Sequence, residues 1–244
     1  MIVKKLAQLC SVFVVVFLIS AMVSSVGRPA NAATDAEIIR GFNLTMFGAE
    51  YSPFGYQSNY IRKFNGTVRF YVHNLSRKNR KREVTRFIRS LNGSIRGLKA
   101  EVTNRPERAN FHVYVVDRKD YTATVRQKVY RRPTANTPGK CLVRSVFSRA
   151  GIRRSDAVIV SDEGESLFKR CKAEEILQGL GPLNEHVSLR ESMFNDRTKH
   201  TNFTRFDKLI LNMLYDKRIA NGAVRESVQG LLPDVLRDAK RRVR

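Results

Sequence analysis

The side chains best suited to chemistry lie in one short stretch that begins at Cys171. Apolar periodicity predicts a helix over residues 166–180. At 100° per residue, Cys171, Glu174 and Gln178 fall on one stripe of this helix, and Glu175 lies beside it. Apolar residues cover two other sides, so we expect the helix to be buried, and a buried carboxylate is costly unless it is paired. The adjacent acids are a candidate site, although pairing with the many lysines and arginines is the interpretation that the helix alone favours.

The order of motifs in this region resembles that of a known peptidase family. Residues 174–184 resemble the zinc-binding helix of the metzincin peptidases, His-Glu-x-x-His-x-x-Gly-x-x-His. Met193, in the run Ser-Met-Phe, resembles the methionine of their Met-turn, and residues 203–215 resemble their closing helix. The resemblance covers residues 65–215 and is specific only over 171–215. The same block, with a cysteine before Glu-Glu-x-x-Gln, is similar to an uncharacterised family of exported bacterial proteins.

The metzincin resemblance implies a general base without a zinc site. Glu175 matches the catalytic glutamate, whereas the three histidine positions hold Glu174, Gln178 and Asn184. Zinc favours imidazole, thiolate and carboxylate ligands, and without it nothing lowers the pKa of a water molecule for Glu175 to activate. One carboxylate and two amide oxygens suit a hard cation such as calcium better, but they form a weak set. We therefore expect a pseudoenzyme without a metal or cofactor, in which these three residues form a polar network between the helix and the following loop.

Cys141 and Cys171 are the two cysteines outside the N-terminal segment. In an exported chain they are candidates for one disulfide, which would stabilise the fold by about 3–4 kcal/mol. A catalytic thiol is the alternative, but no histidine lies near either cysteine in the sequence. We expect the disulfide.

The four histidines add no further site. His73, His112 and His200 lie in strand or loop contexts without a partner at metal-binding spacing. His186 follows Asn184 by two residues and could approach the candidate site if the loop bends back. A lone histidine near a helix end is more often a surface residue.

Residues 1–32 have the three parts of a secretory signal peptide: a pair of lysines, an apolar core and an Ala-Asn-Ala cleavage site. A retained membrane anchor is the alternative, which the serines, glycine and proline of the segment disfavour. We expect an extended N-terminal segment over residues 33–63 and a single domain over 64–244, because no linker or repeat divides the remainder.

Hydrophobic patterning predicts a sheet followed by helices. Strands are expected at residues 67–72, 111–116, 142–147 and 157–160. Helices are expected at residues 84–91, 166–180, 204–214 and 223–243. Pro233 should kink or restart the last helix, and Asp207 stands where a capping-box acid would be. The fold class is α+β and zincin-like, with a small mixed sheet in the N-terminal half and a helical C-terminal half.

The chain is strongly basic, with a formal net charge of +23. Its densest cationic clusters lie at residues 77–82 and 240–244. Neither has the interleaved glycine and aromatic residues of an RNA-binding sheet, so nucleic acid is not the favoured partner. The charge favours an anionic envelope polymer, a membrane surface or a protein partner, although a solvated face that keeps the protein soluble accounts for it equally well.

The leading hypothesis is an exported protein, periplasmic or secreted, that is non-catalytic and binds an anionic envelope component or partner through its basic surface. A peptidase-like hydrolase is the first alternative, with Glu175 activating water beside an unconventional metal or none. A basic binder of nucleic acid or a host partner is the second. Binding that falls steeply with salt would support that last interpretation.

Overall fold

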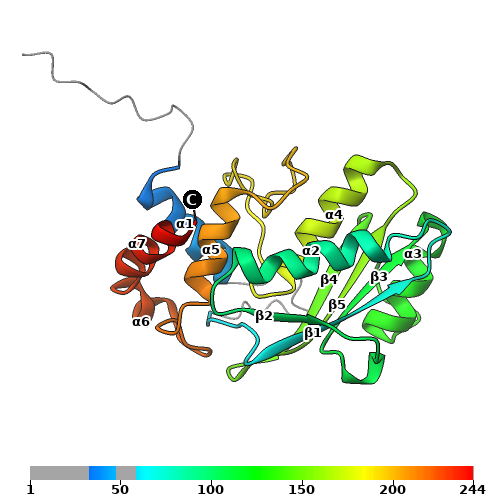
Figure 1. The fold of residues 1–244 in the computed structure, drawn as a ribbon, viewed down its shortest axis with the longest axis horizontal. Coiled ribbons are helices and arrows are strands. Elements are labelled where there is room, and N and C mark those ends of the chain that lie inside the picture. Colours follow the sequence, from blue (N-terminus) through cyan, green and yellow to red (C-terminus); the bar gives the residue numbers. More distant parts are fainter. Residues whose placement is uncertain (1–32, 48–58, 244) are drawn as a thin grey trace, which may run out of the picture. The chain divides into compact units, whose positions relative to one another are not determined.

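The computed structural model describes residues 33–47 and 59–243, and its main element is a five-stranded mixed sheet (Figure 1). The strands are β1 (Thr67–Asn74), β2 (Lys99–Val102), β3 (Phe111–Val116), β4 (Cys141–Ser148) and β5 (Gly151–Val160). Their order in the sheet is β2-β1-β3-β5-β4. The first four strands in this order run parallel, and β4 pairs antiparallel with β5 at one edge.

Helices cover the sheet and make up the C-terminal part of the described chain (Figure 1). They are α1 (Asp35–Met46), α2 (Lys81–Ser94), α3 (Arg118–Thr124), α4 (Glu165–Gln178), α5 (Arg205–Leu214), α6 (Arg225–Gln229) and α7 (Leu232–Arg242). A short 3-10 turn, Pro106–Arg108, precedes β3, and a π-helical segment, Val125–Tyr130, continues α3.

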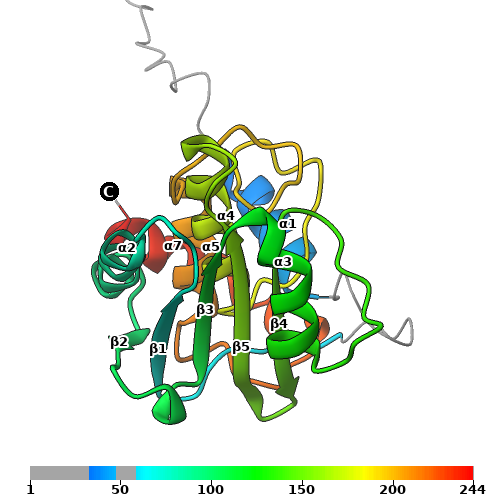
Figure 2. The ribbon, with the colours of Figure 1, turned by 90° about the vertical axis from the view of Figure 1, so that its right-hand side faces the viewer.

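Strand β3 is buried on both sides because helices cover both faces of the sheet (Figure 2). Phe111, Val113 and Val115 face the main core, to which α2, α4 and α5 also contribute. Tyr114 and Val116 face a smaller core on the other side, formed with α3 and the π-helical segment. Successive side chains of a strand point to opposite faces, which explains the division. Helices α2 and α4 therefore lie on the same face of the sheet.

The first described helix, α1, corrects the expectation of an extended segment over residues 33–63. Thr34 caps the helix in a capping box, and Ile38, Phe42 and Met46 are buried in the main core, where α1 packs against α5 and α7. These three apolar residues recur at i, i+4 and i+8, which is one face of a helix. The surrounding polar residues obscured this pattern.

The predicted α+β arrangement is confirmed, with a mixed sheet in the N-terminal half and helices in the C-terminal part. All four predicted strands are present, but β2 and α3 were missed. Strand β2 has four residues, of which only Ala100 is buried. Helix α3 and its π-helical continuation bury Tyr121, Val125 and Val129 among polar and charged neighbours, so their apolar face is narrow.

The two local predictions for the C-terminal helices are also confirmed. Helix α6 ends at Gln229, and α7 begins at Leu232 with Pro233 in its first turn, where a missing N–H costs nothing. Thr204 and Asp207 form a capping box at the start of α5. Each side chain accepts a hydrogen bond from the backbone N–H of the other residue.

The predicted signal peptide, residues 1–32, lies outside the described residues, so it stays an expectation. Within the described ranges, no helix combines the length and the apolar character needed to cross a lipid bilayer.

Candidate functional site

Helix α4 carries the acids that the sequence singled out, and it is buried. From Cys171 to Gln178, every side chain belongs to a residue that is at most 9% exposed. Two sides of the helix differ in chemistry. We call the side with Cys171, Glu174, Glu175 and Gln178 the acidic side, and the side with Lys169 and Lys172 the cationic side.

The acidic side is a network that joins α4 to the loop after it. Glu174 accepts a hydrogen bond from Arg170 at 3.1 Å, and Arg170 also donates to the backbone carbonyl of Asp196 at 2.8 Å. The side-chain amide of Gln178 donates to the Glu185 carboxylate. Carboxylate oxygens of Glu174, Glu185 and Asp196 lie within 4.8 Å of one another. The acids are thus held together by an arginine, an amide and the loop backbone.

The predicted disulfide between Cys141 and Cys171 is present. It joins the first residue of β4 to the middle of α4, with a Cα–Cα distance of 5.8 Å. The Cys141 sulfur and carboxylate oxygens of Glu174 and Glu175 also lie within 4.8 Å of one another. Disulfides persist in oxidising compartments, so this bond indicates a non-cytoplasmic environment.

Asn184 and Met193 fix the loop after α4 to two neighbouring helices. The Asn184 amide donates to the backbone carbonyls of Leu44 and Phe47, at 3.1 and 3.2 Å. It therefore ties the loop to the end of α1, and the expected network of Asn184 with Glu174 and Gln178 stays a prediction. Met193 is fully buried, and its backbone N–H donates to the Asp207 carboxylate at 3.1 Å. This bond fixes the loop to the capping box of α5.

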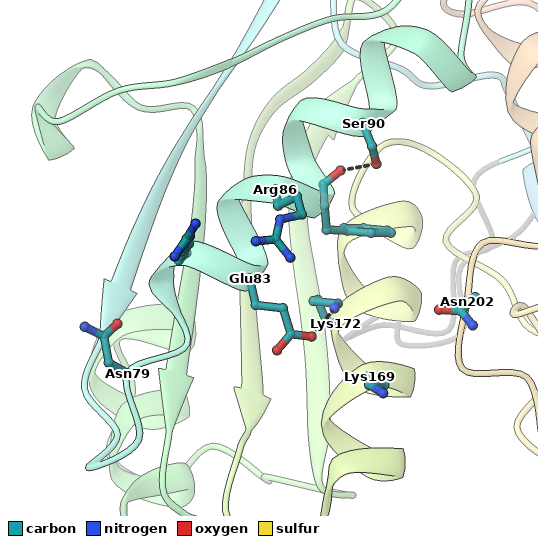
Figure 3. Close-up of a pocket in the computed structure, with 9 residues that line it drawn as sticks. Asn79, Glu83, Arg86, Ser90, Lys169, Lys172 and Asn202 are labelled. Carbon is teal, nitrogen blue, oxygen red and sulfur yellow. Dashed lines mark hydrogen bonds and ion pairs between the residues drawn. The ribbon is translucent and has the colours of Figure 1, made fainter.

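A pocket of about 570 Å³ opens between α2 and the cationic side of α4 (Figure 3). Polar and charged side chains line it around one phenylalanine: Asn79, Arg82, Glu83, Arg86, Phe87, Ser90, Lys169, Lys172 and Asn202. Its single acid, Glu83, binds the Lys172 ammonium at 2.6 Å, so the lining neutralises its own negative charge. Arg82, Arg86 and Lys169 form no ion pair within the part of the chain that the structure describes. The pocket thus carries uncompensated positive charge.

Part of the cationic cluster over residues 77–82 is bound by carboxylates of the chain itself. Arg80 and Lys78 both bind Glu165, and the Arg80 hydrogen bonds, followed by those of Lys78, hold the Glu165 pKa at about 2. Arg82 is the member of the cluster that lines the pocket. A count of cationic residues therefore overstates the charge that this segment presents to a partner.

Two histidines that the sequence left without partners meet on the other face of the sheet. The Nε2 of His73 on β1 lies 3.1 Å from the Nδ1 of His112 on β3, and the His73 ring stacks on Tyr114 at 4.3 Å. Burial, together with the neighbouring histidine, lowers the His73 pKa to about 4, and burial also lowers the pKa of His112. Sequence spacing cannot reveal the pair, because it depends on the register between β1 and β3.

The sequence shows the spacing of the cations within each helix of the pocket, but not the pocket itself. Arg82 and Arg86 are four residues apart on α2, and Lys169 and Lys172 are three apart on α4, so each pair occupies one helix face. Nothing in the spacing shows that the two faces meet. Their meeting follows from the packing of both helices against the same face of the sheet, α2 between β1 and β2 and α4 after β5.

Comparisons with known proteins support one part of the proposed resemblance. A search of the curated proteins finds no match. A family model described as "Protein of unknown function (DUF2927)" matches residues 35–234, which is most of the chain and includes the pocket and the acidic side of α4. This match supports the resemblance to an uncharacterised family and gives no support to the metzincin resemblance. The chain belongs to the DUF2927 family.

Proposed function

We propose that the protein is an exported, non-catalytic binding protein that holds an anionic polysaccharide of the cell envelope in the pocket between α2 and α4. One observation carries the proposal: Arg82, Arg86 and Lys169 line a hollow and have no ion pair among the described residues. Elsewhere, cations of the same surface bind carboxylates of the chain itself, as Arg80 and Lys78 do. Positive charge that is not balanced by nearby acids in a hollow favours the binding of an external anion.

The other side chains of the lining favour a sugar over a bare anion. Asn79, Ser90 and Asn202 present amide and hydroxyl groups that can bond to hydroxyls (Figure 3). Phe87 adds apolar surface to the lining, with the Lys172 ammonium 5.6 Å from the centre of its ring. Guanidinium groups bind carboxylate or phosphate in a fork geometry. A sugar polymer with acidic substituents combines all three chemistries, whereas a flat membrane surface does not require a hollow.

Export to the periplasm or the medium agrees with the expected signal peptide and with the disulfide. The hydrolase alternative has less support, because Glu175 is 5% exposed and is not part of the pocket lining. A general base must reach the proton that it abstracts. We therefore place Glu175 in the framework of α4.

The test is the binding of a sulfated polysaccharide, heparin, measured by titration calorimetry at low salt. We expect Arg82→Ala/Arg86→Ala to weaken binding about tenfold, which corresponds to the loss of two exposed charge contacts. The matched control is Arg105→Ala/Arg108→Ala, which removes the same charge from two exposed arginines between β2 and β3. We expect this control to change affinity less than threefold. Equal losses in both variants would show that net charge alone drives binding and would reject the pocket.

Two other probes separate the classes of partner. Vesicles that contain phosphatidylglycerol test a membrane surface, and duplex DNA of mixed sequence tests a nucleic acid. The proposal predicts that only heparin binding depends on the pocket arginines more than on the control arginines. A pocket-specific loss for either of the other probes would replace the polysaccharide as the ligand.

A further inference from the structure

The Cys141–Cys171 disulfide occupies a sulfur atom that lies beside two carboxylates. The Cys141 sulfur lies within 4.8 Å of carboxylate oxygens of both Glu174 and Glu175, and these oxygens lie equally close to each other. The two acids and Cys171 stand at i, i+3 and i+4 on α4, so one turn of the helix directs them to the same region. Cys141 approaches from β4.

This set of ligand atoms lies in a poorly solvated part of the protein. Cys171 is fully buried, and Glu174 and Glu175 are 4% and 5% exposed, so two carboxylates share a poorly solvated space beside sulfur. Arg170 binds Glu174 from one side. A divalent ion between these ligand atoms would be attracted strongly, because little water screens charges in such a space.

We propose that reduction of the Cys141–Cys171 disulfide creates a binding site for a divalent transition metal such as Zn²⁺, with Cys141, Glu174 and Glu175 as ligands. One thiolate and two carboxylates form a three-ligand set of the kind that zinc accepts, and water completes the coordination. In the oxidised protein the Cys141 sulfur has no thiolate to offer. The site is therefore controlled by the redox state and is independent of the polysaccharide pocket.

An external thiol is the reductant of the Cys141–Cys171 disulfide. A thiol attacks the Cys141 sulfur, which is the partly exposed one, and the Cys171 sulfur leaves with the electron pair of the S–S bond. A second thiol then releases Cys141, so two protein thiols and one external disulfide form. Binding of the metal ion displaces the proton of the Cys141 thiol to solvent, so affinity falls as the pH is lowered.

Two single variants test the proposal because they lose the same disulfide. Cys171→Ser leaves Cys141 beside both acids, and Cys141→Ser leaves only Cys171. With Co²⁺ as the probe, we expect Cys171→Ser to bind one ion per chain without any reductant and to show thiolate-to-cobalt charge-transfer absorption that Zn²⁺ abolishes. We expect Cys141→Ser to bind at least tenfold more weakly and to lack this absorption. Circular dichroism reports whether each variant is folded.

Co²⁺ binding by the reduced native protein is a second test, and it needs no substitution. The reduced protein should bind Co²⁺ with the same absorption, and the oxidised protein should not. Glu175→Gln in the Cys171→Ser background should weaken binding at least tenfold, whereas Glu107→Gln, at an exposed acid, should not change it. Equal binding by the two cysteine variants, or no binding by the folded reduced protein, would overturn the proposal.

Discussion

The two sides of α4 differ in whether their charged side chains are paired within the chain. On the acidic side, Glu174 is bound by Arg170, and Gln178 binds Glu185 in the following loop. On the cationic side, Lys172 is bound by Glu83, but Lys169 is exposed and joins the arginines of α2 around a hollow. The difference teaches that buried charge is neutralised within the chain, whereas the charge that stays uncompensated is at the surface of a pocket. We infer that the acidic side maintains the fold and that the cationic side binds.

The largest effect on stability should come from the disulfide that secures the acidic side. We expect Cys141→Ala/Cys171→Ala to lower the free energy of unfolding by about 3–4 kcal/mol, because the open chain gains conformational entropy when it unfolds. Urea denaturation of the oxidised native protein and the variant measures this difference. Heparin affinity should stay within threefold while the variant is folded. A large loss of affinity without a loss of stability would break the comparison.

Glu174→Gln should have the next largest effect. It removes the charged partner of Arg170, and a hydrogen bond to a charged group contributes about 1.5–3 kcal/mol. Urea denaturation should show a decrease of this size, with heparin binding unchanged. Glu107→Gln is the control at an exposed acid, and it should change the free energy of unfolding by less than about 0.5 kcal/mol.

The pH dependence separates stability from binding. The His73 pKa is lowered to about 4 in the folded protein, mainly by burial and then by the neighbouring His112, whereas an unfolded histidine titrates near about 6.5. The unfolded chain therefore binds more protons below that pH, and stability is lost as the pH falls from about 6.5 toward 4.

We expect the melting temperature to fall by about 2–5 °C between pH 6.5 and 5, above the range where most carboxylates titrate. His73→Gln should flatten this dependence, and His200→Gln should not. Heparin binding by the folded protein should stay constant over this range, because arginine and lysine as residue types titrate far above it. Heparin binding that follows the melting curve would contradict the separation of the two sides.

Glu83→Gln should have the smallest effect and sharpens the account of the pocket. It removes the single acid of the lining and releases Lys172, so the pocket becomes more positive. We expect heparin to bind about twofold to threefold more tightly, which is the scale of one exposed charge contact. Titration calorimetry checks the direction. Weaker binding would show that the Lys172–Glu83 pair itself positions the ligand.

The sequence predicted most of the fold because its signals are local. The strand around Val113, the capping box at Asp207 and the restart at Pro233 each depend on a few adjacent residues. Helix α1 was not predicted because polar residues surround its apolar positions, and α3 was not predicted because its apolar face is narrow. The candidate site was predicted less well. The disulfide followed from the cysteine count, but the place of Asn184 at the end of α1 depends on long-range packing.

The pocket could not be predicted from the sequence either, because it also depends on long-range packing. Whether Arg86 and Lys169 share a hollow is decided by the positions of α2 and α4 on the sheet, not by the spacing within either helix. The density of cations at residues 77–82 also overstated the charge available there, because Arg80 and Lys78 are bound to Glu165 and Arg82 is the cation of the cluster that lines the pocket. Ion pairs between segments that are distant in the sequence decide which cations can bind a ligand. The number of cationic residues in a segment does not.

The salt dependence of heparin binding tests the central claim most directly. The logarithm of the association constant should fall linearly with the logarithm of the salt concentration, because each contact with the polyanion releases condensed counterions. The account predicts that Arg82→Ala/Arg86→Ala makes this slope shallower by about the two lost contacts. The control Arg105→Ala/Arg108→Ala should leave the slope of the native protein unchanged. An equal change of slope in both variants would contradict the claim that binding is confined to the pocket between α2 and α4.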